Sequence, residues 1–305
     1  MRVIFLALSL TILPAQELVW QRGLPDEGLT GGAGRFTWGR RVLRWSGAKS
    51  REVARSPHGY DDGGCVFAKE DLILAERPAT GPLGRLVHLP APRYKPVVID
   101  TGVELHDCVP ATLFGRSGFL MVHRFTQVRF YWLTAGRWQM QEIYSIYTAS
   151  RQGGLAVFDV DGDGRQDIVC GNYWVRSPER FDLPWHIFAI NLLHAEPEDA
   201  NFVLAPWRRE LLALQRERVP TPLRRFTPLA DPKQLWAETD DGTYERPTAI
   251  SPQSSELWIG DAAGLTAWPS GRRWATGHPV IAILPGGLVV GPDRVTRWLL
   301  QPLRK

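Results

Sequence analysis

Residues 153–175, GGLAVFDVDGDGRQDIVCGNYWV, decide the fold that we expect for this chain. Two apolar runs, LAVF at 155–158 and DIVC at 167–170, flank a turn made of aspartate and glycine, and a third run, YWV, follows at once. β-Branched and aromatic residues favour strands, whereas glycine and aspartate favour turns. The stretch therefore predicts short β-strands joined by tight turns.

The same order of a polar start, a turn and a strongly apolar strand recurs along the chain, beginning near residues 58, 104, 246 and 278. The apolar strand after each turn begins near residues 71, 118, 167, 210, 256 and 287, so that most intervals are about 46 residues and the last is nearer 30. Residues 34–45 supply one further strand pair. A period in the forties with several short strands per unit is typical of a β-propeller. We predict an all-β, single β-propeller over residues 17–305, with seven blades and six or eight as alternatives.

The last unit is short, and we expect an N-terminal strand around QELVWQRGL, at 16–24, to complete it and to remove the free sheet edges. Residues 208–219, RRELLALQRERV, have the composition of an amphipathic helix, but their position in the repeat favours strands.

The first sixteen residues have the layout of a secretory signal peptide. Arg2 precedes an apolar run over 3–13, which Pro14, Ala15 and Gln16 follow. This run is short for a membrane span, and no other segment has the length and apolar character to cross a bilayer. We therefore expect residues 1–16 to direct export to a periplasm or the cell exterior, the alternative being a buried first strand.

The three cysteines, Cys65, Cys108 and Cys170, lack the spacing of a zinc or haem motif. In an exported protein one disulfide and one buried thiol are expected. We favour a Cys65–Cys108 pair, because both residues precede comparable strands in successive repeats.

The formal net charge is +4, and one segment is rich in arginine. Glu210 and Glu217 interleave with these arginines, and strand periodicity would divide them between two faces, so we predict a solvated surface and no nucleic-acid binding. The arginines concerned are Arg208, Arg209, Arg216, Arg218, Arg224 and Arg225.

The turn DVDGDGRQD concentrates four carboxylates in nine positions. Carboxylates this close repel one another unless a cation lies among them, and calcium prefers six to eight oxygen ligands in flexible geometry. We predict one structural calcium ion. Its ligands would be the side chains of Asp159, Asp161, Asp163 and Asp167 and the backbone carbonyl of Arg165.

The loop departs from an EF-hand, because its twelfth position is Cys170 and its flanks are strand-like. Residues 154–175 instead resemble the FG-GAP/VCBS repeat of integrin-alpha-type propellers. That resemblance implies a calcium-binding loop between the first two strands of a blade. The other units resemble the family in rhythm alone, so the resemblance implies one calcium ion in this chain.

Ligands of propellers bind at the mouth of the central channel, where the repeat frame places His58, Asp61, His106, Asp107, Arg246 and His278. A histidine with an aspartate can act as an acid/base pair, or the two can simply satisfy each other's hydrogen bonds. No nucleophile elbow, HExxH motif or phosphate-binding loop is present. We expect an exported, calcium-stabilised propeller that binds a protein or carbohydrate without catalysis. The alternative is a propeller enzyme, a polysaccharide lyase or glycosidase, that uses these histidines and aspartates.

Overall fold

The structure is a computed structural model. It describes residues 17–22, 30–46, 49–124, 126–145, 153–191, 202–215, 218–247, 249–253, 255–275, 279–280, 282–284, 288–290 and 296–301. The regular secondary structure of this described part consists of β-strands. Within it, no helix is long and apolar enough to cross a membrane. The expected signal peptide at 1–16 and His278 lie outside the described residues.

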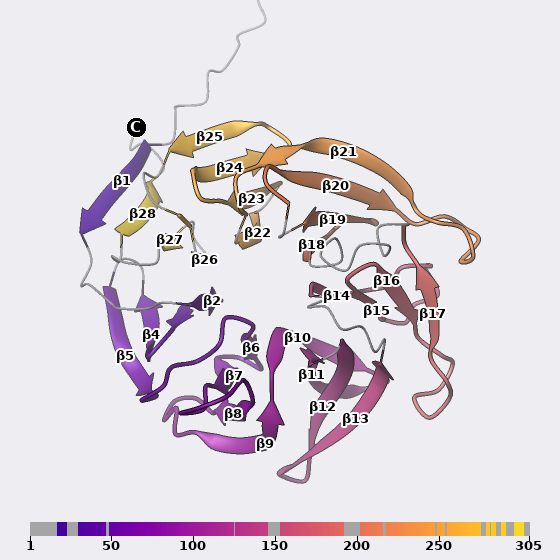
Figure 1. Cartoon of the computed structure of the whole chain (residues 1–305), viewed down its shortest axis with the longest axis horizontal. Helices are drawn as coiled ribbons and strands as arrows, with labels where there is room; N and C mark the ends of the chain where they lie inside the picture. Colours follow the sequence, from indigo (N-terminus) through magenta and orange to yellow (C-terminus); the bar gives the residue numbers. More distant parts are fainter. Residues whose placement is uncertain are drawn as a thin grey trace, which may run out of the picture.

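The strands form seven four-stranded antiparallel sheets that surround a central axis (Figure 1). The first three sheets are β2 (Gly31–Ala33), β3 (Phe36–Trp38), β4 (Arg41–Ser46) and β5 (Lys49–Arg55); β6 (Cys65–Phe67), β7 (Asp71–Glu76), β8 (Gly84–Leu89) and β9 (Val97–Val103); and β10 (Leu105–Leu113), β11 (Arg116–His123), β12 (Gln127–Thr134) and β13 (Arg137–Ser145). The next three are β14 (Leu155–Phe158), β15 (Asp167–Cys170), β16 (Tyr173–Arg176) and β17 (His186–Ala189); β18 (Phe202–Trp207), β19 (Glu210–Gln215), β20 (Thr221–Thr227) and β21 (Ala237–Tyr244); and β22 (Ala249–Gln253), β23 (Glu256–Gly260), β24 (Gly264–Trp268) and β25 (Arg272–Ala275). The last sheet joins both ends of the chain and comprises β1 (Glu17–Arg22), β28 (Thr296–Gln301), β27 (Leu288–Val290) and β26 (Ala282–Leu284) in that order.

This arrangement confirms the predicted single all-β propeller. The second strand of each repeat begins within two residues of the expected position, and residues 210–215 form strand β19 in place of the alternative helix. β1 pairs antiparallel with β28, with Trp20 opposite Trp298, as the expected closure by an N-terminal strand requires.

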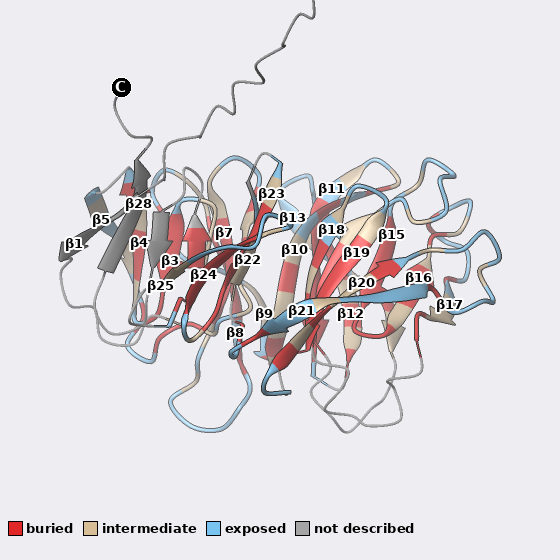
Figure 2. Ribbon diagram, turned by 90° about the horizontal axis from the view of Figure 1, so that it is seen from above, coloured by how far each residue is buried: buried red, intermediate tan, exposed pale blue. Residues whose placement is uncertain are grey.

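The core lies between neighbouring sheets, so the middle strands are buried on both faces (Figure 2). In β7 the side chains of Leu72 and Leu74 pack toward the preceding sheet, whereas Ile73 and Ala75 pack toward the following one. All four residues have no exposed surface. A continuous apolar run is therefore required in place of the alternation that a half-exposed strand would show.

The innermost strands β2, β6, β10, β14, β18, β22 and β26 contact one another in that order and close a ring. Glycines allow this close approach. A Cβ atom on Gly63 would lie 2.8 Å from the backbone carbonyl of His106, and one on Gly32 would lie 2.8 Å from Cβ of Ala282.

A disulfide joins Cys65 of β6 to Cys108 of β10 and so links two adjacent inner strands, with Cα atoms 5.3 Å apart. This is the pair that the repeat positions favoured. Cys170 is a buried thiol, and burial raises its pKa to about 12.

Candidate functional site

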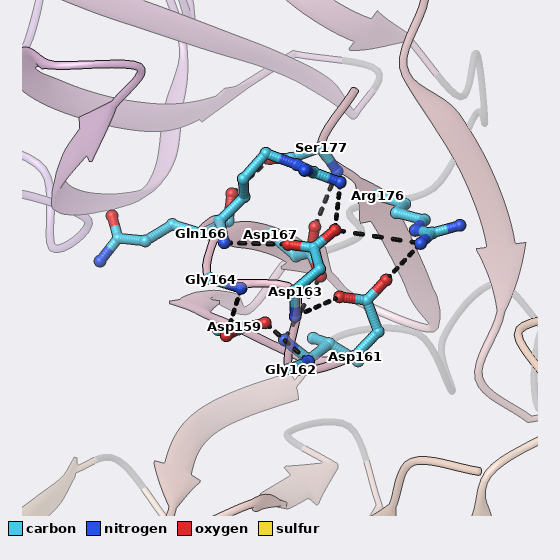
Figure 3. Close-up of polar contacts among 11 residues, drawn as sticks. Asp159, Asp161, Gly162, Asp163, Gly164, Gln166, Asp167, Arg176 and Ser177 are labelled. Atoms are coloured by element: carbon cyan, nitrogen blue, oxygen red, sulfur yellow. Dashed lines mark hydrogen bonds and ion pairs between the residues drawn. The ribbon is translucent and has the colours of Figure 1, made fainter. Parts of the chain in front are cut away.

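The acidic loop connects β14 to β15, and its shape follows from the backbone donors that its carboxylates accept (Figure 3). The backbone N–H of Gly162 donates to Oδ1 of Asp159 over 2.8 Å, and that of Gly164 donates to Oδ2 over 2.9 Å. Both glycines have positive φ, of 78° and 85°, which most side chains disfavour. Aspartate acceptors and glycine dihedrals together fold the loop over itself.

Three of the predicted ligands converge. One carboxylate oxygen each from Asp159, Asp161 and Asp167 lies within 4.8 Å of the others. Asp163 is outside this group, because its carboxylate accepts from the backbone N–H of Arg165 over 2.9 Å and pairs with the guanidinium of the same residue. An all-oxygen donor set of this kind suits calcium better than a softer metal.

Asp167 is the buried member of the cluster, with no exposed surface. Its carboxylate accepts from the backbone N–H of Ser177 over 2.7 Å and of Val160 over 3.3 Å. Desolvation raises the pKa of Asp167 to about 6. The hydrogen bond from Ser177 opposes this rise, and the negative charge of Asp161 adds to it. A cation beside this carboxylate would favour its ionised form.

Arg176, at the end of β16, also approaches the loop. Its Nη2 lies 2.6 Å from Oδ2 of Asp161 and 3.9 Å from Oδ2 of Asp163 (Figure 3). The guanidinium groups of Arg176 and Arg165 offset part of the carboxylate charge. Arg176 lies outside the loop, so the spacing of residues within the loop gives no sign of it.

Asp167 has a counterpart in another sheet, which gives it a second role. Asp71 likewise opens the second strand of its sheet, and its carboxylate accepts from the backbone N–H of Ala91, beyond the third strand, over 2.8 Å. The matching bond in the acidic-loop sheet is the one from Ser177 to Asp167. In both sheets, an acidic residue at the first position of the second strand therefore fixes the chain after the third strand.

A cavity of about 740 Å³ lies on the axis, at the face where the inner strands begin. We call this face the start face. All seven sheets, or the residues that lead directly into them, contribute to its lining. The lining residues are Thr30, Gly31, Gly32, Asp62, Gly63, Gly64, His106, Asp107, Val109, Leu155, Val203, Leu204, Val219, Arg246, Pro247, Ala249, Ile250, Ala282 and Ile283.

Three residues expected at the channel mouth, His106, Asp107 and Arg246, line this cavity. His106 Nε2 lies 3.7 Å from Oε1 of Glu104, and Oδ1 of Asp107 accepts from the backbone N–H of Cys108 over 3.0 Å.

His58 and Asp61 do not line the cavity. His58 is exposed in the connection between β5 and β6. Asp61 pairs with Arg77 at 2.8 Å, and burial raises its pKa although Arg77 opposes the shift. The lining residue is the next one along the chain, Asp62, which the sequence reading missed. The structure therefore does not bring the four expected His and Asp side chains into one acid/base site.

The acidic loop and the cavity lie at opposite ends of the inner strands. Leu155, the first residue of β14, lines the cavity, and the acidic loop follows the last residue, Phe158. The loop is thus on the face where the inner strands end, away from the cavity.

Two of the clustered arginines have acidic partners across β20 and β21. Arg224 pairs with Glu238, and the Nε atom of Arg225 lies 2.9 Å from Oδ2 of Asp241. Their positive charge is locally balanced, as expected for a solvated surface.

No protein-family model matches the chain. No curated protein matches it either. Solved structures do resemble it. A structure of YCF48 bound to a D1 peptide has 10% identity, a TM-score of 0.61, and coverage of 96% of this chain and 98% of that one.

Two further solved structures also resemble the chain over most of its length. The BBS1N chain in complex with ARL6DN has 12% identity, a TM-score of 0.54 and coverage of 93% and 97%. The β-propeller domain of Cps50 (Swd1) from Myceliophteria thermophila has 12% identity, a TM-score of 0.55 and coverage of 93% and 100%. These similarities support the propeller fold. They do not extend to the FG-GAP/VCBS repeat family.

Proposed function

We propose that this protein is a non-catalytic binding module that holds a polypeptide segment in the axial cavity of the start face. The observation that carries the proposal is the cavity itself, to which all seven sheets contribute. Its volume lies within the range of roughly 300–1,000 Å³ that is usual for ligand sites.

The lining favours a polypeptide over a carbohydrate. Among the described residues that line the cavity there is no tryptophan, tyrosine or phenylalanine on which a sugar ring could stack. Charged groups of both signs, backbone and small apolar side chains are present, which suits a peptide. The enzyme alternative rests on His106 and Asp107 alone, since His58 is exposed outside the cavity and Asp61 pairs with Arg77.

Cavity binding can be tested with two matched variants. Val219 is 52% exposed at the cavity edge, and Val97 is 49% exposed on the outer strand β9. Either position should therefore accept tryptophan without loss of folding. A phage-displayed library of random peptides is selected on the wild-type protein, and each recovered peptide is assayed on both variants. We expect Val219→Trp to lose the peptides and Val97→Trp to keep them; equal binding to both variants would refute the cavity as the binding site.

The calcium ion is a second part of the proposal, with Asp159, Asp161 and Asp167 as its side-chain ligands and the carbonyl of Arg165 as a further one. The support is the convergence of three carboxylates and the chemistry of the oxygen donors. The ion would order the turn between β14 and β15 and so stabilise the sheet. Likeness to the FG-GAP/VCBS repeat is confined to this loop.

The calcium proposal is tested by thermal unfolding in calcium and in chelator. At a calcium concentration a hundred times Kd, the folded state gains about 2.7 kcal/mol, a rise in Tm of roughly 5 °C for a chain of this size. We expect the rise in the wild type and not in Asp161→Asn. The control is Asp182→Asn, an exposed acid paired with Arg180 outside the loop, which should respond as the wild type does. A wild-type Tm that is the same in calcium and in chelator would refute the calcium site.

Export through a signal peptide at residues 1–16 completes the proposal. The Cys65–Cys108 disulfide supports it, because disulfides persist in oxidising compartments. N-terminal sequencing of the secreted protein is the direct test, and the expected first residue is Glu17, which follows the predicted signal peptide.

A further inference from the structure

We infer that the cavity selects a peptide that carries a cationic group and a carboxylate, because the structure places opposite charges on opposite sides of its mouth. This inference rests on the proposed function and specifies the ligand of the same site.

The acidic side is formed by two neighbouring sheets. Asp62 lies just before β6 and is exposed, and Asp107 lies near the start of β10; both line the cavity. His106 also lines the cavity, and its Nε2 atom lies 3.7 Å from Oε1 of Glu104. Asp61, the other acid of this segment, is already paired with Arg77 outside the cavity. A lysine or arginine of a ligand would meet carboxylates here.

The basic side is Arg246, which lies three residues before the start of β22. Its side chain is exposed at the cavity, and the structure records no ion pair between it and a described residue. Its φ of 51° lies in the left-handed region, so a replacement residue must also tolerate that backbone conformation. An arginine that lines a cavity and has no ion pair to a described residue is a group that would receive a carboxylate.

The order of the sheets sets these two sides against each other. Around the closed ring, β22 is three sheets away from β10 through β18 and β14, and three sheets away from β6 through β26 and β2. In a ring of seven, the position three steps from both members of a neighbouring pair is directly opposite that pair. Figure 1 shows β22 across the axis from β6 and β10.

Small residues also form part of the cavity wall. Gly31, Gly32, Gly63 and Gly64 line it on one side, and Ala249 and Ala282 line it on the other. These residues place backbone groups and small side chains at the cavity wall, where a peptide main chain can bond to them. A ligand with one charge of each sign, spanning the cavity, satisfies both sides at once, whereas a ligand with one sign of charge leaves the opposite side unpaired.

The test compares the peptide pools that the wild type and its charge variants select. Arg246→Asn removes the positive charge, and asparagine is chosen because it tolerates the left-handed backbone conformation at this position. Arg246→Lys is the matched control that keeps the charge. Asp62→Asn removes one carboxylate. Each variant is selected from the same random library, and only peptides lost on Val219→Trp are counted.

We expect the wild-type pool to be enriched in peptides with both a basic and an acidic group. The Arg246→Asn pool should lose the acidic enrichment and keep the basic one, Asp62→Asn should weaken the basic enrichment, and Arg246→Lys should resemble the wild type. Selected peptides, synthesised, should bind Arg246→Asn roughly fivefold more weakly. An amidated C-terminus that abolishes binding would support the inference and identify the carboxylate as the chain end.

The failures are distinguishable. If cavity-dependent peptides are recovered without charge bias, or with a bias that the variants leave unchanged, the inference is refuted while the proposed function stands. If no recovered peptide is sensitive to Val219→Trp, the proposed function fails and this inference fails with it.

Discussion

The disulfide between β6 and β10 should carry a large share of the stability of this propeller, and the size of its contribution can be worked out. It joins Cys65 and Cys108 across a sequence separation of 43 residues. In the chain-entropy description, a link of this length removes about 13 cal/mol/K from the unfolded chain, or about 4 kcal/mol at 25 °C. Small domains are stable by only about 5–15 kcal/mol, so such a loss would be severe.

The perturbation is the double substitution Cys65→Ala/Cys108→Ala, compared with the oxidised and the reduced wild type. Guanidinium unfolding followed by tryptophan fluorescence gives the free energy of unfolding. We expect the free energy of unfolding of the double variant to be about 4 kcal/mol lower than that of the oxidised wild type, and to be unchanged by reductant. Reductant should lower the free energy of unfolding of the wild type toward the value of the double variant. Part of any loss in the variant arises from the two buried sulfur atoms, but the response of the wild type to reductant is free of that contribution.

Two controls decide the interpretation. Cys170 is buried and outside the disulfide, so Cys170→Ala should keep the response to reductant in full. The denatured, unreduced wild type should show one free thiol of its three cysteines. Three free thiols, or an oxidised wild type that unfolds at the same denaturant concentration as the double variant, would refute the reasoning.

Two further changes test packing and charge. Gly118→Ala should cost about 2–4 kcal/mol in a denaturant titration, because a Cβ there would lie 2.0 Å from the carbonyl oxygen of Tyr131, whereas the exposed neighbour Ser117→Ala should be nearly neutral. Burial, with the charge of Arg129 adding to it, lowers the pKa of His123 to about 4 from its ordinary value of 6.5, so the unfolded chain takes up the proton first as the pH falls. Stability should therefore decline by about 3 kcal/mol between pH 6.5 and 4, and this contribution should be absent from the pH profile of His123→Asn. Identical slopes for the two proteins would refute that assignment.

Features that follow from local chemistry or from the repeat were predictable from the sequence. Glycine and aspartate mark the turn before β15, and the apolar run after it can only be a strand that is covered on both faces. Comparable places in successive repeats favoured a pair between Cys65 and Cys108, and the structure contains this disulfide. β1 could be assigned to the last sheet because the final unit lacked a strand.

Features that depend on one-residue register were not predictable. The repeat frame placed Asp61 at the channel mouth, but the cavity is lined by Asp62, and Asp61 turns to Arg77. Successive side chains in an extended chain point to opposite sides, so an error of one position reverses the assignment. The acidic loop shows the same limit in another form, since Arg176 reaches Asp161 from a different strand and no spacing within the loop could reveal it.

The separation of the two sites along β14 limits how calcium could influence binding. Leu155 at one end lines the cavity, and the acidic loop begins beyond Phe158 at the other end, with the buried pairing of β14 and β15 between them. A cation in the loop would stabilise this sheet relative to the unfolded chain, and its removal would lower the population of folded molecules. Because the cavity is built by all seven sheets and charged by Asp62, Asp107 and Arg246 on three others, the remaining folded molecules should keep the same cavity. Calcium is therefore expected to act on how much protein is folded, and the charges of the start face on what the folded protein binds.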